Sequence, residues 1–373
     1  MNRKTIVISA VNLVVGGTLT ILRDCLEYLS KLSETGNYRI IALVFDKNLA
    51  LYPNIEYIEL QWPKKKWVNR LWCEYVSMKK IADEIGPVYL WLSLHDTTPN
   101  VVAEHRAVYC HNPFPFYRWS WRELWFNYKI VLFSWFSYFI YKINIHKNRF
   151  VIVQQQWIKD AFMQMYSLPS EKVIVSVPNK KEDNTSPQYI ESDDRFSFIF
   201  ASSANSHKNF ECLCEAAKLL ENEIGVDKFR VIITINGTEN KYAQWLYSRW
   251  GAVSSIEFAG FMDRKTLFGY YQMVDCMVFP SKVETWGLPI SEFGLFDKPM
   301  LLANELYAHE TASGLDKVAF FKTDEPKDLA EKMKKVMAGD KQILSTVEKV
   351  HISVPKCYSW QSMFDLLLKD KEE

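Results

Sequence analysis

Short apolar runs alternate with longer amphipathic runs along almost the whole chain. In its first half the apolar runs predict strands, and the runs with a helical period predict helices. The predicted strands are Thr5–Ala10, Arg39–Phe45, Tyr89–Leu94, Ala107–Cys110 and Phe150–Val153, and the predicted helices are Thr18–Thr35, Asn69–Ile85 and one within Glu123–Ile143. Strands that alternate with helices indicate a parallel α/β architecture.

The same alternation starts again after Pro178–Pro187, a polar stretch with a proline at each end that predicts a linker. Further strands are predicted at Phe196–Ala201, Arg230–Ile235, Ile256–Phe258 and Cys276–Pro280, and further helices at Asn209–Asn222, Asn240–Trp250, Lys265–Met273 and Pro289–Phe296. A chain of 373 residues has room for two domains. We therefore expect two Rossmann-like, doubly wound domains that face each other across a cleft, with ligands at the carboxyl ends of the strands.

Composition and charge narrow the class of protein. Hydrophobic residues make up 48% of the chain and charged residues 24%, which excludes a disordered or fibrous protein. The net charge of +1 argues against a dedicated nucleic-acid binder. However, residues 1–180 hold 22 Lys and Arg against 14 Asp and Glu, whereas the remaining residues are net acidic. A basic first half suits a phosphate-bearing ligand or an anionic membrane, although an uneven share of solvated charge explains the numbers equally well.

Aromatic residues are 15% of the chain and gather in Phe114–Tyr141, where 14 of 28 residues are aromatic. Within this stretch Ile130–Tyr141 carries no charge, but its 12 residues are too few to cross a membrane, which takes about 20. Interleaved basic residues would let the stretch lie in a bilayer interface. A long buried helix is the equal alternative, so the pattern leaves both readings open.

Other patterns bear on compartment and cofactors. The seven cysteines are scattered without a CxxC pair, which favours a reducing cytoplasm over a disulfide framework or a zinc site. The N-terminal apolar run is short and leads directly into Gly16, so it predicts a first strand rather than a signal peptide. Asp-x-Asp, GxGxxG and P-loop patterns are missing from the sequence, so we expect neither a bound metal nor a dinucleotide cofactor.

The strongest chemical pattern is the stretch Pro280–Gly294, which follows a predicted strand and opens a helix. Gly287 permits a tight loop, and the amides around Gly287 and Leu288, at the start of the helix predicted from Pro289, are free to bind a phosphate. Glu284 precedes this helix and Glu292 lies in its first turn, so we expect both carboxylates to face a ligand there. Carboxylates accept hydrogen bonds from sugar hydroxyls. A sugar attached to a phosphate therefore fits this arrangement.

This stretch resembles the nucleotide-sugar signature of retaining GT-B glycosyltransferases of family 4, in which two glutamates eight positions apart flank Gly-Leu-Pro. The resemblance implies that Glu284 contacts the donor sugar near the reacting carbon and that Glu292 holds the ribose hydroxyls. It also implies a retaining, metal-independent transfer.

Ser206-His207-Lys208-Asn209 resembles the place where the family carries a lysine that neutralises the donor diphosphate. The resemblance implies this role for Lys208 and places Asn209 among the donor-binding residues. Many members have an arginine five residues earlier, where this chain has Ser203. In the family this arginine and the lysine hold the donor diphosphate together. With Ser203 in its place, the second positive group is left open, and helix amides, Lys282 and Arg264 are the candidates.

Two further segments continue the resemblance through the second half. Glu257–Met262 is similar to the family's strand and glycine loop that reads the nucleobase, which implies donor contacts from Phe261 and Met262. Tyr358-Ser359-Trp360 looks like the start of the last helix, which returns to the first domain. The expected domains are therefore an acceptor-binding domain over residues 1–180, a nucleotide-sugar-binding domain over 181–355, and a returning helix in 356–373.

The first domain carries three weaker candidate groups at predicted strand ends. Gly16 and Gly17 resemble the family's glycine pair, which lets the backbone approach the donor phosphate and the acceptor. His111 resembles the histidine that lies beside the donor sugar. His95 and Asp96 follow another strand and are candidates for the acceptor side, although a structural turn is the equal alternative.

The resemblance implies a cytoplasmic glycosyltransferase, peripheral at the inner face of the plasma membrane, that builds bacterial capsule, O-antigen or lipopolysaccharide. The donor would be a UDP- or GDP-linked sugar, with no cofactor, and the acceptor a glycan hydroxyl, lipid-linked through a polyprenyl carrier. A sugar-nucleotide epimerase on the same scaffold is the alternative, and it predicts turnover without an acceptor. A non-catalytic nucleotide-sugar binder is a third hypothesis, and it predicts binding without transfer.

Overall fold

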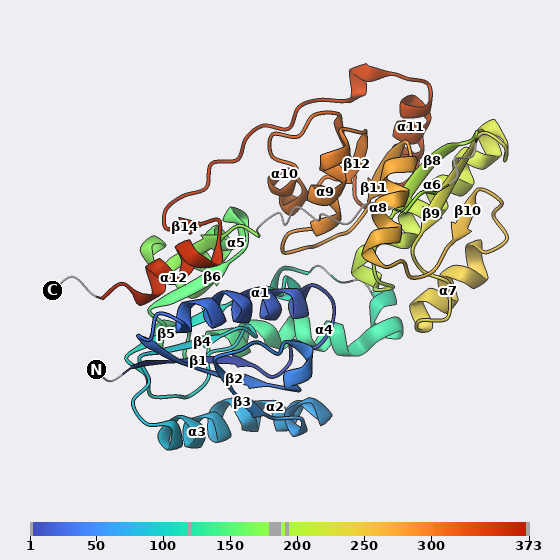
Figure 1. Ribbon diagram of the computed structural model, residues 1–373. Helices are drawn as coiled ribbons and strands as arrows, with labels where there is room; N and C mark the ends of the chain where they lie inside the picture. The colour runs from blue at the N-terminus through green and yellow to red at the C-terminus, as the bar shows by residue number, and fades with distance from the viewer. Residues whose placement is uncertain (1–2, 118, 120, 179–187, 191–193, 371–373) are drawn as a thin grey trace. The chain divides into compact units, whose positions relative to one another are not determined.

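The computed structural model describes residues 3–117, 119, 121–178, 188–190 and 194–370 (Figure 1). The chain divides into two compact units. The first consists of Met1–Asn112, Phe136–Asn179 and His351–Glu373, and the second of Pro113–Trp135 and Lys180–Val350. Residues 179–187 of the predicted linker lie outside the described part of the chain.

The first unit is built on an eight-stranded parallel sheet with the order β14-β7-β6-β5-β4-β1-β2-β3. Its strands are β1 (Lys4–Ala10), β2 (Tyr38–Val44), β3 (Ile55–Glu59), β4 (Leu90–Ser93), β5 (His105–Tyr109), β6 (Phe150–Val153), β7 (Val173–Ser176) and β14 (Lys356–Cys357). Its helices are α1 (Gly16–Ser33), α2 (Trp67–Trp72), α3 (Met78–Ile85), α5 (Gln156–Tyr166) and α12 (Trp360–Leu368), joined by the second half of α4 (Trp121–Lys142). The fully buried residues of β1 show why its sequence is almost wholly apolar: a central parallel strand is covered on both faces.

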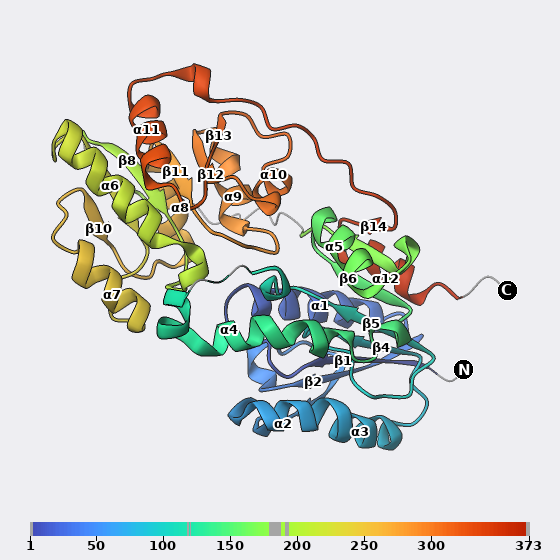
Figure 2. The same cartoon turned by 180° about the vertical axis from the view of Figure 1, so that it is seen from behind.

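Helices cover both faces of this sheet, with α1 on one side and the pair α2 and α3 on the other (Figure 1 and Figure 2). On the α1 side the core includes the returning helix α12, where Phe364 stacks on Tyr28 with ring centroids 5.4 Å apart. On the opposite side Val7 and Ile41 pack with Met78 and Ala82 of α3. The end of the chain, from His351 onward, is thus part of the first unit.

The second unit has a six-stranded parallel sheet with the order β10-β9-β8-β11-β12-β13. Its strands are β8 (Phe196–Phe200), β9 (Phe229–Ile233), β10 (Ile256–Phe258), β11 (Cys276–Phe279), β12 (Met300–Ala303) and β13 (Val318–Phe321). Its helices are α6 (Phe210–Ile224), α7 (Lys241–Trp250), α8 (Arg264–Met273), α9 (Leu288–Phe293), α10 (Leu306–Thr311) and α11 (Pro326–Met337).

Strand order confirms the predicted fold class of two doubly wound, Rossmann-like domains. In each unit the first strand lies between the second and the fourth, so the order reverses between β1 and β4 and between β8 and β11. Ligands of such sheets bind at this switch point, outside the carboxyl ends of the strands. The loops that follow these four strands are therefore the places to look for a site.

The segment Pro113–Trp135, which the sequence placed in the first domain, belongs to the second unit. Aromatic contacts account for this. Phe114 and Tyr117 lie edge-on to His207 at centroid distances of 5.4 and 5.9 Å, and Phe126 lies 5.3 Å from Tyr242. Part of the aromatic stretch is thus packed against the second unit's own side chains.

Candidate functional site

The switch point of the second unit brings together the two residues with the strongest sequence prediction. Lys208 ends a short 3-10 turn after β8, and Glu284 lies in the loop after β11. The Lys208 ammonium group forms an ion pair and hydrogen bond with Glu284 Oε1, although 76 positions separate the two residues. Both side chains keep a small exposed fraction, 15% for Lys208 and 13% for Glu284, so a ligand can reach them.

Hydrogen bonds join the turn that ends at Lys208 to the loop that carries Glu284. We call Ser206–Lys208 together with residues 281–284 and the turn at Gly287 the cradle. The backbone N–H of Lys282 donates to the His207 carbonyl at 2.8 Å, and Ser281 Oγ donates to Glu284 Oε1 at 2.9 Å. The hydroxyl of Tyr307, on α10, donates to the Ser281 carbonyl at 2.7 Å. The carboxylate and the ammonium group are therefore positioned before any ligand binds, which is the arrangement that favours electrostatic stabilisation.

Gly287 makes the tight turn that starts α9. Its φ of +81° lies in the left-handed region, where residues with a side chain are strained. Leu288 follows as the first helical residue, and its side chain is 41% exposed. Because α9 has only six residues, the helix dipole at this turn is small. The loop's contribution to phosphate binding therefore rests on its backbone N–H groups.

Replacing Gly287 with alanine is expected to destabilise the second unit by about 1–2 kcal/mol, because an L-residue there takes a left-handed conformation. The new Cβ would also lie 3.3 Å from Ile290 Cδ1, inside the usual contact distance. Urea unfolding measures the change. Gly339→Ala is the matched control, since its φ is +73° but nothing lies within 4 Å of its Cβ position. An equal loss in both variants would show that backbone strain alone, and not packing at the cradle, sets the cost.

Glu292 is the fifth residue of α9, just past the first turn in which it was predicted, because the helix begins one residue earlier than expected. Its carboxylate is 19% exposed and forms an ion pair with Arg264 Nη2 at 3.3 Å. Arg264 is the first residue of α8, and the predicted nucleobase loop with Phe261 and Met262 directly precedes it. Phe261 is 89% exposed, so its ring is available to stack on a planar ligand.

Asn209, another predicted donor residue, and Ser203, which stands in place of the family's arginine, both have partners within the protein. Asn209 is almost fully buried, and its Nδ2 donates to the Thr323 carbonyl at 2.7 Å, so the side chain holds the loop after β13. Ser203, at the position of the family's arginine, accepts from Asn205 Nδ2 at 2.9 Å. Of the residues considered for the missing cation, Lys282 pairs with Asp324 at 2.9 Å and Arg264 pairs with Glu292.

In the first unit the loops after β4 and β5 meet beside the switch point. Asp96 Oδ1 accepts from the backbone N–H of His111 at 2.8 Å, and Asp96 Oδ2 lies 3.7 Å from His111 Nε2. Burial lowers the pKa of His111, and the Asp96 charge only partly opposes it, so the ring is neutral at physiological pH. The glycine pair Gly16 and Gly17 opens α1 at the end of β1, with φ of +61° at Gly16.

The loop that carries Asp96 also takes part in a buried charge cluster, through His95 and Thr97, which the sequence analysis did not predict. Glu74 is fully buried, and its Oε1 lies 3.1 Å from Arg70 Nε and 3.2 Å from His95 Nδ1. Thr97 Oγ1 donates to the other carboxylate oxygen. Glu74 belongs to a single π-helical turn, Cys73–Ser77, inside the helix predicted over 69–85. The Arg70–Glu74 spacing of four on that helix was the available signal.

The ionised form of Glu74 makes the stability of the first unit depend on pH. Burial would raise the pKa of this carboxyl, but His95, Arg70 and Thr97 outweigh it and lower the pKa from 4.5 to about 2. The stabilisation is complete above pH 4.5 and is lost as the pH falls from about 4.5 to about 2. Urea unfolding of wild type and Glu74→Gln is expected to give a difference in stability that shrinks over this interval. A difference that stays constant from pH 7 to pH 3 would contradict it.

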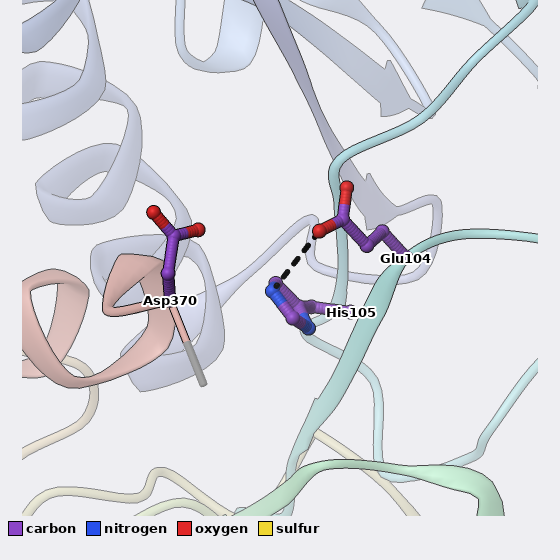
Figure 3. Close-up of side chains that lie close together, drawn as sticks. All are labelled: Glu104, His105 and Asp370. Carbon is purple, nitrogen blue, oxygen red and sulfur yellow. Dashed lines mark ion pairs between the residues drawn. The ribbon is translucent and has the colours of Figure 1, made fainter. Parts of the chain in front are cut away.

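Another cluster has the donor types of a metal site. Glu104, His105 and Asp370 offer ligand atoms within 4.8 Å of one another, and His105 Nε2 lies 3.8 Å from Glu104 Oε1 (Figure 3). Cations already surround the three side chains, because Lys4 pairs with Asp370 at 3.2 Å and Arg149 Nη1 lies 3.3 Å from His105 Nε2. The cluster also sits where β5 begins, at the amino end of the sheet. This arrangement favours an ion-pair network that fastens the chain end.

Comparison with known proteins finds a family match for the second half of the chain. Residues 181–349 match the model of the family described as glycosyl transferases, group 1. No curated protein matches the sequence. Among the described residues, none of the helices is long and apolar enough to cross a membrane.

Solved structures resemble the whole chain at low sequence identity. Sucrose-phosphate synthase from Thermosynechococcus elongatus has a TM-score of 0.66 and 12% identity, with 91% of each chain covered. The lipopolysaccharide outer core galactosyltransferase WaaB has a TM-score of 0.60 and 11% identity over 93% of this chain and 92% of that one. Anabaena Alr3699/HepE, solved with UDP-glucose, has a TM-score of 0.60 and 14% identity over 91% of both chains. These similarities show the fold, which is GT-B. Residues 181–349 in the second unit thus match the group 1 glycosyl transferase family, and the whole chain has the GT-B fold.

Proposed function

We propose that the chain transfers a sugar from a nucleoside-diphosphate sugar to a hydroxyl of a glycan acceptor, with retention of anomeric configuration and without a metal. The Lys208–Glu284 ion pair at the switch point of the second unit supports this most strongly. It presents a cation for a diphosphate and a carboxylate for sugar hydroxyls in one cradle. HepE, which shares the fold, is solved with UDP and glucose, so a UDP-linked donor is the first to test and a GDP-linked donor the second.

In this mechanism the donor diphosphate takes over Lys208 from Glu284. The released carboxylate then orients the donor sugar and supports the positive charge that develops at its anomeric carbon. Lys208 and the backbone amides at Gly287 and Leu288 stabilise the charge on the departing diphosphate, which is usually the largest catalytic contribution. Because these groups meet the diphosphate charge, no metal is required.

Three other residues keep the roles that the resemblance gave them. Glu292 accepts from the ribose hydroxyls once the ligand competes with Arg264, and Phe261 stacks on the nucleobase. His111, neutral because it is buried, contacts the donor sugar as an uncharged hydrogen-bonding group. Asp96 holds His111 in place through the hydrogen bond to its backbone N–H. His95 and Asp96, both buried, remain the proposed residues of the acceptor side. The proposed acceptor is a lipid-linked glycan at the inner face of the plasma membrane, as in bacterial surface polysaccharide synthesis.

A panel of nucleotide sugars tests this function in two steps. The true donor is expected to raise the melting temperature by several degrees, since a ligand at a hundredfold excess over its Kd adds about 2.7 kcal/mol. The same donor should then release nucleoside diphosphate only when acceptor lipids are present. Conversion of the donor to an isomeric nucleotide sugar without acceptor would mean an epimerase. Tight binding with no transfer to any acceptor would mean a non-catalytic binder.

A further inference from the structure

Asp96, in the loop after β4, has a backbone conformation that its surroundings must hold in place. Its φ of +71° lies in the left-handed region, which strains a residue that carries a side chain. Such residues persist where neighbouring contacts fix them, and they gather at functional sites. In this loop the buried cluster around Glu74 supplies contacts to the residues on both sides of Asp96.

Glu74 makes these contacts with a single carboxylate. Its Oε1 lies 3.2 Å from His95 Nδ1, and its other oxygen accepts from Thr97 Oγ1. All three side chains are buried. Because His95 and Thr97 flank Asp96, the carboxylate restricts the backbone of the residue between them.

The helix that carries Glu74 forms further hydrogen bonds with the same loop. Arg70 Nη2 donates to the His95 carbonyl at 3.0 Å, and the Glu74 carbonyl accepts from the backbone N–H of Asn100 at 3.1 Å. Glu74 itself stands on the π-helical turn Cys73–Ser77, a form that is frequent at functional sites. The loop after β4 is thus attached to this helix through both side chains and backbone.

Asp96 in turn contacts His111 at its backbone and near its ring. Its Oδ1 accepts from the His111 backbone N–H at 2.8 Å, and its Oδ2 lies 3.7 Å from His111 Nε2. The other ring nitrogen, His111 Nδ1, is buried and has no hydrogen-bond partner within the described part of the chain. The position of His111 therefore depends on where Asp96 holds its carboxylate.

We propose that Glu74 is a positioning residue for His111 and acts through the left-handed turn at Asp96. For its effect on sugar transfer this inference rests on the proposed function, in which His111 contacts the donor sugar. Glu74 itself touches no substrate, because its side chain is fully buried. Its replacement displaces Asp96 and His111, and a displacement of about 1 Å can lower a catalysed rate by about 10².

The backbone amide signal of His111 in NMR spectra measures this positioning directly. The chain has seven histidines, so isotope labelling of histidine gives seven amide signals, and the His111 signal is the one missing from His111→Ala. In Glu74→Gln, which keeps the shape of the side chain, the His111 amide proton is expected to move upfield, because its bond to Asp96 lengthens. Asp96→Ala marks the position of the signal without this bond. Asp96→Asn keeps an acceptor and tolerates the left-handed conformation, so its signal should lie nearer to wild type.

Two further variants separate positioning from a loss of stability. Thr97→Val removes one of the two contacts beside Asp96 and leaves the Glu74 charge in place, so it should move the His111 signal in the same direction even if Glu74→Gln does not fold. Ile40→Val, on β2, takes a methylene group from the buried core and lowers stability away from this loop. In this control the His111 signal should stay at its wild-type position.

Sugar transfer tests the same link through a double-mutant cycle. Alone, Glu74→Gln is expected to lower kcat by about 10–100-fold with little change in the KM for the donor. Combined with His111→Ala it should lower kcat by less than about twofold, because the group that it positions is already gone. Ile40→Val should leave kcat unchanged.

The two measurements distinguish this inference from the proposed function. If the wild type transfers no sugar from any nucleotide sugar, the proposed function is wrong, and the His111 signal still decides whether Glu74 positions His111. A His111 signal that keeps its wild-type position in Glu74→Gln and Thr97→Val would overturn the inference. A signal that moves equally in Ile40→Val, or a kcat loss of equal size with and without His111, would overturn it as well.

Discussion

Replacing Glu284 with glutamine is expected to separate nucleotide binding from turnover. Sugar transfer should fall by about 10²–10³, the cost of removing a group aimed at transition-state charge. The affinity for the nucleoside diphosphate alone should not fall, and it should rise, because Lys208 no longer has a competing carboxylate in the free protein. Steady-state rates and calorimetric titration with the nucleoside diphosphate measure the two effects.

Lys208→Met is the partner variant, and it should lose both turnover and nucleotide affinity. Lys332→Met is its matched control, since Lys332 forms an ion pair with Asp328 on α11, away from the cradle, and should leave both quantities unchanged. If Glu284→Gln weakened nucleoside diphosphate binding as much as Lys208→Met, the carboxylate would be holding the nucleotide, and the proposed exchange of partners would be wrong.

Replacing Glu74 with alanine is expected to lower the free energy of unfolding of the first unit by about 3–5 kcal/mol, the usual cost of breaking a buried ion pair. The change leaves Arg70 and the buried His95 ring without their shared acceptor and opens a cavity beside the π-helical turn. Urea unfolding, followed by tryptophan fluorescence, measures the loss.

Two comparison variants separate the effect of the buried charge from the loss of any glutamate side chain. Glu74→Gln keeps the shape and a hydrogen-bond acceptor, so it should cost less than alanine. Glu104→Ala removes a carboxylate that is 62% exposed and should change stability by under about 0.5 kcal/mol. A loss at Glu74 no larger than that at Glu104 would mean that the buried cluster contributes little to the fold.

Much of the fold follows from hydrophobic periodicity. Buried parallel strands are apolar runs, so β1, β6 and β11 were predicted within a residue of their observed bounds. The edge strand β3 was missed because its residues are half-buried and alternate with glutamates. The π-helical turn at Cys73–Ser77 was missed because it keeps the apolar pattern of a helix and changes only the hydrogen bonding.

The placement of the candidate site residues was predictable where these residues are close in sequence. Glu284, Gly287 and Glu292 stand in one stretch, and the structure places them around one helix start. Other side chains are positioned by tertiary contacts between residues far apart in the sequence. Asn209 turns to the Thr323 carbonyl 114 positions away, and the Phe114 ring packs on His207, pairings that no local pattern encodes.

In the proposed mechanism, Lys208 exchanges its ion pair with Glu284 for one with the donor diphosphate. The most direct test is a crystal structure of the chain with the nucleoside diphosphate of the sugar donor that stabilises it most. Lys208 Nζ should lie within hydrogen-bond distance of a phosphate oxygen, and Glu284 should be released from the ion pair seen in the free protein. A nucleotide bound elsewhere, or one bound while Lys208 remains on Glu284, would contradict it.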